Sequence, residues 1–157
     1  MANVNRVVII GGGPGGYEAA LVARQLGSEV TLIETDGLGG SAVLTDAVPS
    51  KTLIATAEVM MAVRDAKELG VRIDGDDPSK GLSIDLATVN RRVLALAAAQ
   101  SADIHAKLLA EGVTIVKGRG RLNGTREVIA DTTQGEVRFP ADVILVATGA
   151  HPRELPT

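Results

Sequence analysis

Residues 4–16 have the sequence VNRVVIIGGGPGG, an apolar run that leads directly into a glycine-rich turn. The run from Val4 to Ile10 alternates little between apolar and polar residues, which is typical of a central parallel strand with helices on both faces. A helix is predicted from Pro14, with small residues on one face and a C-cap at Gly27, and a second strand follows at 29–34. Strand, turn, helix and strand in this order predict a right-handed βαβ unit and an α/β fold.

The glycines of the turn have the spacing of a dinucleotide-binding motif. Gly11 permits the tight turn, Gly13 lets the backbone approach a pyrophosphate, and Gly16 lets the helix lie close to the strand. Pro14 and Gly15 fill the positions between them, at the helix N-terminus, where free N–H groups favour an anion. The alternative is a tight βα turn without a ligand, but strand, spacing and helix all agree with the motif.

Glu34 ends the second predicted strand, 18 residues after Gly16. A carboxylate near this offset accepts hydrogen bonds from ribose hydroxyls in dinucleotide-binding folds. Asp36 follows closely, and no Arg or Lys occupies positions 33–40. A 2′-phosphate would therefore meet two carboxylates, so we expect the site not to hold NADP. The motif does not by itself choose between NAD and FAD.

The middle of the chain predicts a long loop and two helices. Residues 35–49 are expected to form a functional loop, followed by a helix that Ser50 caps and Gly70 closes. Residues 74–82 are expected to form a surface loop, and Asp85 caps a second helix that runs to about Glu111. The expected buried faces are Leu53, Ala57, Met60, Met61 and Val63 in the first helix, and Leu86, Val93, Leu96, Ala97, Ile104 and Leu108 in the second.

The last third of the chain has the period of strands. Strands are predicted at 113–116, 120–122, 126–130, 135–139 and 143–147. Asn123-Gly124 and Gln134-Gly135 are hairpin signals. We therefore expect a small antiparallel meander, inserted before a final apolar strand that rejoins the parallel sheet.

The composition excludes several classes of function. The chain has 157 residues, a net charge of −3, 45% apolar residues and only Tyr17 and Phe139 as aromatics, so one aliphatic domain is expected and a nucleic-acid partner is not. The first apolar run is too short for a signal peptide or a membrane span, which favours a cytoplasmic protein with no membrane partner. With no cysteine in the sequence, disulfides and thiol chemistry by this chain are excluded, and no metal site is predicted.

Residues 37–51, GLGGSAVLTDAVPSK, carry a more specific signal. The segment resembles the redox-active region of the pyridine nucleotide-disulfide oxidoreductases, flavoproteins that include dihydrolipoamide dehydrogenase and glutathione reductase. In that family a Gly-Gly pair leads into two cysteines separated by four residues, and then into Pro-Ser-Lys beside the flavin. The residues that match in register are Gly39, Gly40, Pro49, Ser50 and Lys51. Ala42 and Ala47 stand at the two cysteine positions.

Two further stretches resemble the same family. Gly118 and Gly120 lie where its backbone runs beside the adenine. Residues 147–149, Ala-Thr-Gly, with Pro152 and Leu155-Pro156 after them, resemble its crossing toward the nicotinamide domain. The resemblance covers only the family's first segment, so residues 1–157 are expected to be the N-terminal part of a Rossmann-like FAD-binding domain, without the nicotinamide and dimerisation domains.

The resemblance implies FAD as cofactor, NAD(P)H as co-substrate of the full-length enzyme, and homodimers among full-length relatives. Lys51 is expected to lie against the flavin and tune it. A cation in the first turn of a helix also opposes the macrodipole by about 0.3–1 kcal/mol, which suggests another use. The expected cofactor-binding residues are Gly11, Gly13, Pro14, Gly15, Gly16, Glu34, Gly39, Gly40, Ser41, Lys51, Gly118, Gly120, Ala147, Thr148 and Gly149.

Alanine at both cysteine positions changes the chemistry that the resemblance implies. Ala42 and Ala47 offer neither nucleophile nor leaving group, so hydride on the flavin would pass to a diffusible acceptor such as a quinone. His105 and His151 are interpreted as surface residues and not as the family's catalytic histidine. Two alternatives stay open: a non-catalytic nucleotide-binding module, and a truncated dihydrolipoamide dehydrogenase-like fragment, which would be inactive alone. The alanines themselves could be natural or engineered.

Overall fold

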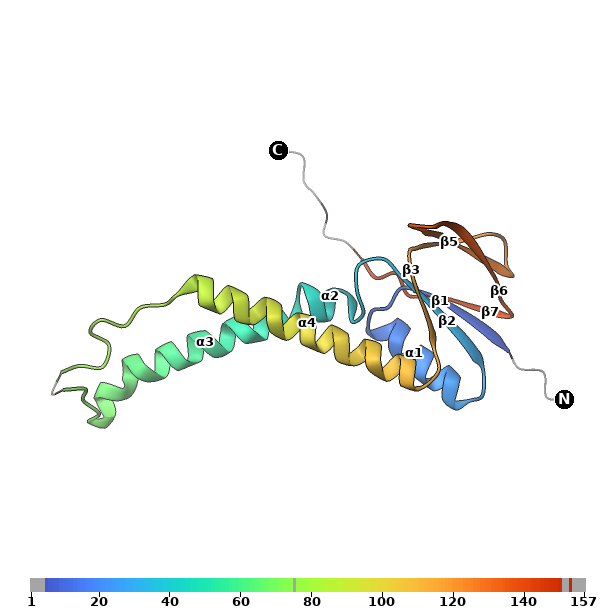
Figure 1. Cartoon of the computed structure of the whole chain (residues 1–157). Helices are drawn as coiled ribbons and strands as arrows, with labels where there is room; N and C mark the ends of the chain where they lie inside the picture. The colour runs from blue at the N-terminus through green and yellow to red at the C-terminus, as the bar shows by residue number, and fades with distance from the viewer. Residues whose placement is uncertain (1–4, 75, 151–152, 154–157) are drawn as a thin grey trace.

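A computed structural model describes residues 5–74, 76–150 and 153 and contains two sheets and a long helical hairpin (Figure 1). His151, Pro152, Leu155 and Pro156 lie outside the described residues. The strands are β1 (Arg6–Ile10), β2 (Glu29–Glu34), β3 (Thr114–Lys117), β4 (Arg119–Leu122), β5 (Glu127–Thr132), β6 (Gly135–Pro140) and β7 (Val143–Val146). The helices are α1 (Pro14–Gln25), α2 (Gly40–Leu44), α3 (Ala47–Asp65) and α4 (Leu86–Ala110), with a 3₁₀ turn, η1 (Ala66–Leu69).

The larger sheet is parallel throughout and has the strand order β3-β2-β1-β7. Its register places the last residues of the strands at one edge, since Ile10 pairs with Ile33 and Val146 while Glu34 pairs with Lys117. In open α/β sheets, ligands bind outside this carboxyl edge. The predicted βαβ unit and the return of the final strand to the parallel sheet are both confirmed.

The two faces of the parallel sheet are covered by different elements, which gives three layers. On one face Ile9 and Leu32 pack with Ala20 and Leu21 of α1 and with Leu108 of α4. On the other face the antiparallel sheet β4-β5-β6 covers Val8, Ile10 and Ile33 with Val128 and Ala130. Coverage of both faces explains why β1 shows a continuous apolar run in the sequence. The predicted meander is confirmed: Gly124 lies in its first hairpin turn and Gly135 begins β6 directly after the second, both with positive φ.

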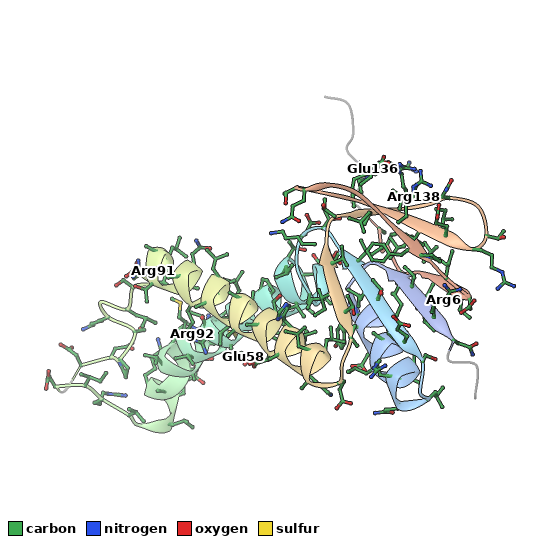
Figure 2. The ribbon with its side chains drawn as sticks, turned by 45° about the vertical axis from the view of Figure 1, so that its right-hand side comes forward. Arg6, Glu58, Arg91, Arg92, Glu136 and Arg138 are labelled. Atoms are coloured by element: carbon green, nitrogen blue, oxygen red, sulfur yellow. The ribbon has the colours of Figure 1, made fainter. Side chains whose placement is uncertain are left out.

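Helices α3 and α4 form an antiparallel hairpin that extends away from the sheets (Figure 1). Asp85 caps α4 as predicted, because its side chain accepts hydrogen bonds from the backbone N–H groups of Ala87 and Thr88. Gly70, with φ 82°, ends the turn after α3 as predicted. Figure 2 shows Glu58, Arg91 and Arg92 on this hairpin, far from Glu136 and Arg138 on the small sheet.

The predicted apolar faces of the hairpin are wrong at several positions. The exposed members are Leu53, Ala57 and Met61 of α3 and Leu86 and Leu96 of α4. A hairpin of two helices has only one seam, so half of a broad apolar stripe stays in contact with solvent. The residues of α3 that are buried or partly buried are Val48, Pro49, Thr52, Thr56, Met60 and Val63. Val93 and Ala97 of α4 are buried as predicted.

Residues 35–49 are not the continuous loop that the sequence predicts. They contain the five-residue helix α2, and α3 begins at Ala47, with Asp46 and not Ser50 at its N-cap. Pro49 misled the prediction, because a proline is compatible with the first turn of a helix, where its missing N–H has no intrahelical partner. Lys51 is therefore the fifth helical residue, beyond the turn in which the macrodipole acts strongly, and the predicted electrostatic opposition does not apply.

Among the described helices, α4 alone is long and apolar enough to cross a membrane by length and composition. Only 17% of its apolar window is buried, although α4 packs against α1, α2, α3 and β3. The prediction of no membrane partner stays a prediction.

Candidate functional site

The first glycine turn joins β1 to α1 at the carboxyl edge of the sheet. Gly11 has φ 104°, and a Cβ there would collide with the carbonyl of Ala147. A Cβ on Gly16 would collide with the carbonyl oxygen of Gly11. These two glycines are required by the fold itself: the first for the turn and the last for close packing of helix and strand, as the motif predicts.

Gly13 and Gly15 differ from their neighbours because they face open space. A Cβ on Gly13 would meet only the Cα of Gly40, at 4.0 Å, and a Cβ on Gly15 would meet no atom within 4 Å. Gly13 has φ −67°, which any residue adopts, so the protein itself does not need glycine there. Because no side chain covers the backbone at the N-terminus of α1, a phosphate group of a ligand can approach it closely.

A second glycine turn, Gly37–Gly40, lies directly against the first. The Gly39 N–H donates to the carbonyl of Gly12 at 2.8 Å. Gly39 and Gly40 have φ 95° and 54°, and a Cβ on Gly40 would lie 2.9 Å from the Cα of Gly13. The Gly-Gly pair that the sequence analysis singled out therefore permits close contact between the two turns, and Ser41 follows at the exposed start of α2.

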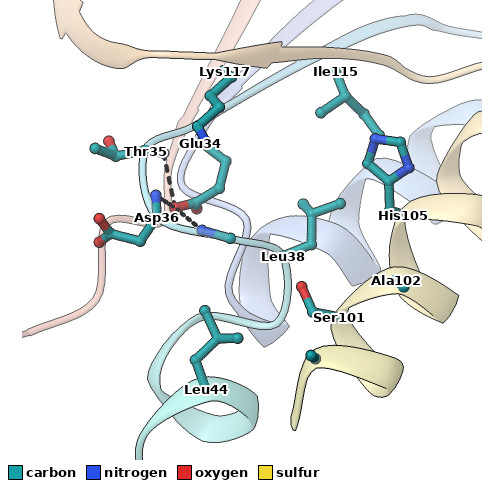
Figure 3. A pocket seen from close by; sticks show the side chains of 12 residues that line it. Glu34, Thr35, Asp36, Leu38, Leu44, Ser101, Ala102, His105, Ile115 and Lys117 are labelled. Carbon is teal, nitrogen blue, oxygen red and sulfur yellow. Dashed lines mark hydrogen bonds between the residues drawn. The ribbon is translucent and has the colours of Figure 1, made fainter. Parts of the chain in front are cut away.

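Glu34 joins both turns through its half-buried carboxylate. Oε1 accepts hydrogen bonds from the backbone N–H groups of Thr35 (2.8 Å), Asp36 (2.8 Å) and Gly37 (3.4 Å) (Figure 3). Oε2 accepts one from the backbone N–H of Gly12. The position of Glu34 at the end of β2 agrees with the prediction. Its four bonds could not be foreseen, because their donors are backbone groups.

A pocket of about 540 Å³ lies beside Glu34, between the loop after β2, the strand β3 and the helix α4 (Figure 3). Its apolar wall includes Leu38, Leu44 and Ile115, and Lys117 and His105 add polar groups. Lys117 is the register partner of Glu34 across the two strands. Positions 33–40 contain no cation, but the fold brings Lys117 to this pocket from a distant part of the chain.

His105 is exposed, as predicted, yet it also lines this pocket. The sequence analysis missed Lys117, Ser101 and His105 as pocket residues. Lys117 lies on β3, and Ser101 and His105 lie on α4, all far in the sequence from Glu34. Only the tertiary fold brings them to the pocket, so no local sequence pattern identifies them.

The other predicted residues surround the same edge. The Gly118 N–H donates to the Glu34 carbonyl at 2.9 Å, and its Cα faces the backbone of Asp131. A Cβ on Gly120 would lie 2.8 Å from a side-chain carbon of Ile10, so this glycine serves packing between the sheets. Residues 147–149 follow β7 beside Gly11, and Gly149 has φ 69°.

Ala42, Ala47 and Lys51 belong to the junction of α2 and α3. Ala42 is half-buried in α2, Ala47 is the exposed first residue of α3, and Lys51 is exposed one turn later. The Asp46 N–H donates to the Ser41 carbonyl at 2.7 Å, which holds the two short segments together. The two alanine methyl groups are chemically inert, and the sequence contains no cysteine that could replace them.

The model of the pyridine nucleotide-disulphide oxidoreductase family matches residues 5–157. The chain belongs to this family. The structure of LpdA from Mycobacterium tuberculosis is similar, with a TM-score of 0.86 and 46% identity over 98% of this chain and 33% of that chain. The fold is also similar to that of the flavoprotein disulfide reductase RclA from Escherichia coli, with a TM-score of 0.74 at 20% identity over 98% of this chain and 30% of that chain.

Two curated relatives of this chain carry different descriptions. An NAD(P)H dehydrogenase (quinone) of Mycobacterium tuberculosis is 49% identical over 98% of this chain and 32% of its own length. A dihydrolipoyl dehydrogenase of Zymomonas mobilis is 33% identical over 99% of this chain and 32% of its own length. The chain therefore spans about a third of the length of the relatives that it matches.

Proposed function

We propose that this chain binds FAD as the first part of a flavin-dependent NAD(P)H oxidoreductase that lacks the redox-active dithiol. The observation that carries the proposal is the contact between two glycine turns at the carboxyl edge of the sheet, with Gly13 and Gly15 open to a ligand. Backbone N–H groups at the N-terminus of α1 would hold the pyrophosphate, and the pocket beside Glu34 would hold the adenosine.

When bound, FAD supplies hydride acceptance and donation, which no side chain of this protein offers. The chain's own residues orient and tune it. Lys51, on α3, provides the positive charge expected near the isoalloxazine ring, which stabilises negative charge there. Ala42 and Ala47 take no part in electron transfer, so the proposed route ends on a diffusible acceptor and not on a protein disulfide.

A quinone is the proposed acceptor class. The support is the similarity, at 49% identity, to a protein described as an NAD(P)H dehydrogenase (quinone), together with alanine at both cysteine positions. NAD(P)H as co-substrate, residues 1–157 as the N-terminal segment of the FAD domain, homodimerisation of the longer protein and a cytoplasmic location also belong to this proposal.

The experiment is a titration of the purified chain with FAD and, separately, with NAD. Flavin fluorescence quenched at a 1:1 stoichiometry, with no saturable NAD binding, is the expected result. Saturable NAD binding without FAD binding would point to the alternative, a nucleotide-binding module without flavin. The acceptor is tested by steady-state assays on a full-length relative with alanine at these two positions, where quinone reduction and no lipoamide reduction are expected.

A further inference from the structure

Helix α3 leaves one of its faces exposed to solvent. The helix packs against α2 and α4, and its covered side includes the buried Thr52 and the half-buried Thr56. Ile54 is two residues away from each of them, about 200° around the helix, and it is 56% exposed. The face that contains Ile54 is therefore opposite to the covered side of α3.

Helical spacing gives the other members of this face. Ala47, Lys51 and Ile54 are separated by four and then three residues, so they lie above one another on the same side of α3. All three are exposed. In order along the helix they present a methyl group, an ammonium group and a large aliphatic side chain.

Ile54 draws interest through its position and not through its exposure, because single exposed aliphatic residues are common on protein surfaces. It lies one turn beyond Lys51, which is proposed to lie beside the flavin, and two turns beyond Ala47, which stands at a cysteine position of the family. Apolar groups therefore lie on both sides of the lysine, and none of them can exchange electrons with a disulfide.

A quinone matches these three side chains chemically. Its flat ring is apolar and its carbonyl oxygens accept hydrogen bonds, so the ring can pack on Ile54 while the Lys51 ammonium donates to one oxygen. The proposed reaction reduces the quinone to a hydroquinone with a hydride from reduced flavin and a proton from solvent. Negative charge develops on the carbonyl oxygens in this step, and the lysine stabilises it.

We propose that the face of α3 formed by Ala47, Lys51 and Ile54 is the docking surface of the quinone acceptor, with Ile54 as the residue on which the ring packs. This inference rests on the proposed function and adds to it the place where the acceptor binds. Charge complementarity favours a quinone over a second copy of this chain, because a two-fold pairing of this face would bring two Lys51 side chains together.

The test is a titration of the isotope-labelled chain with 2-methyl-1,4-naphthoquinone, followed by NMR, with and without bound FAD. The chain has no cysteine, so this quinone cannot alkylate a thiol. We expect saturable shifts of the methyl groups of Ala47 and Ile54. No comparable shift is expected for Ile73, which is 58% exposed in the segment between α3 and α4.

The variant Ile54→Asn is compared with Val59→Asn on the same helix. Val59 is 64% exposed but lies about 140° around the helix from Ile54. I54N should weaken quinone binding at least about fivefold, because the ring loses its apolar contact. V59N should leave the affinity unchanged.

Reoxidation of the photoreduced, FAD-loaded chain gives a second readout. I54N should slow the reaction with the quinone and leave the reaction with ferricyanide unchanged, because ferricyanide is a hydrated anion that does not pack on an apolar side chain. Equal slowing with both acceptors would mean that the substitution acts on the flavin, which would overturn the role of Ile54.

The two hypotheses fail separately in this design. FAD binding without any quinone-induced shift at Ile54, in the loaded and the free chain, would overturn the docking surface and leave the proposed function standing. A chain that binds no FAD but shows the Ile54 shift would contradict the proposed function and support the docking surface. An Ile54 signal that changes with protein concentration and not with quinone would assign the face to a second copy, against the inference.

Discussion

Arg6 and Asp142 bind each other at the starts of two neighbouring parallel strands. The guanidinium donates to both carboxylate oxygens, from Nε at 3.1 Å and from Nη2 at 3.0 Å, and the Arg6 N–H adds a third bond at 3.0 Å. The Asp142 N–H donates back to the Arg6 carbonyl. This pair fixes β7 beside β1 at the end of the sheet opposite to the proposed site.

The pair predicts an acid-sensitive contribution to stability. Hydrogen bonds from Arg6 lower the pKa of Asp142 from 3.8 to about 2. Because the pKa is depressed in the folded state, the contribution is complete above about pH 4 and is lost as the pH falls toward 2. Urea unfolding should show D142N less stable than wild type at pH 7, with a difference that shrinks below pH 4. D103N, at an exposed position of α4, is the control. A difference independent of pH would contradict this account.

Two glycines of the turn between β1 and α1 are predicted to have different roles, Gly16 in the stability of the fold and Gly13 in ligand binding. G16A should destabilise the fold by about 3 kcal/mol, because its Cβ collides with the Gly11 carbonyl and overpacking costs are of this order. G13A has room within the protein and should cost about 1 kcal/mol or less as an N-cap change, yet abolish FAD binding. Urea denaturation and FAD titration of both variants check this. Tight FAD binding by G13A would contradict the pyrophosphate site.

Lys51 is predicted to tune the flavin through its charge. In the FAD-loaded chain, K51M should lower the two-electron reduction potential by roughly 30 mV, equivalent to about 1.4 kcal/mol, because negative charge on the reduced ring loses a cation. K51R should retain most of the wild-type potential. K107M, near the end of α4, serves as the control for loss of one positive charge. An identical potential in K51M and wild type would remove Lys51 from the site.

Adjacent leucines of α4 test where its buried face lies. Leu108 is fully buried against the sheet, whereas Leu109 is half exposed. L108A should lower the free energy of unfolding by about 2–5 kcal/mol, since it loses burial and leaves a cavity. L109A should change it by about 0.5 kcal/mol. Equal losses in the two variants, measured by urea unfolding, would mean that α4 is rotated from the position described.

Much of the core fold could be predicted from the sequence because each element carries a local signal. The run before Gly11 predicts β1, Asp85 predicts the start of α4, and Gly124 and Gly135 predict the hairpins. The errors arise where the signal is not local. Helix α2 is only five residues long and begins with glycine, so neither periodicity nor propensity reveals it.

In the candidate site, too, some features have a local signal in the sequence and others depend on the tertiary fold. The positions of Gly11, Gly16 and Glu34 follow from spacing, and the structure brings them to one edge of the sheet. The four hydrogen bonds of Glu34 and the approach of Lys117 depend on how strands and turns meet in space. Every residue except proline has a backbone N–H, so the type of residue does not reveal which N–H groups donate to Glu34. Lys117 is 83 positions away in the chain, and it becomes the register partner of Glu34 only through the order of strands in the sheet.

The most direct test of the central claim is the identity of the cofactor that the chain retains. The protein is purified without added nucleotide, denatured, and the released small molecules are identified by absorbance and mass spectrometry, before and after reconstitution with FAD. We expect a yellow protein that releases FAD, up to one per chain. A colourless protein that takes up no FAD on reconstitution would contradict it.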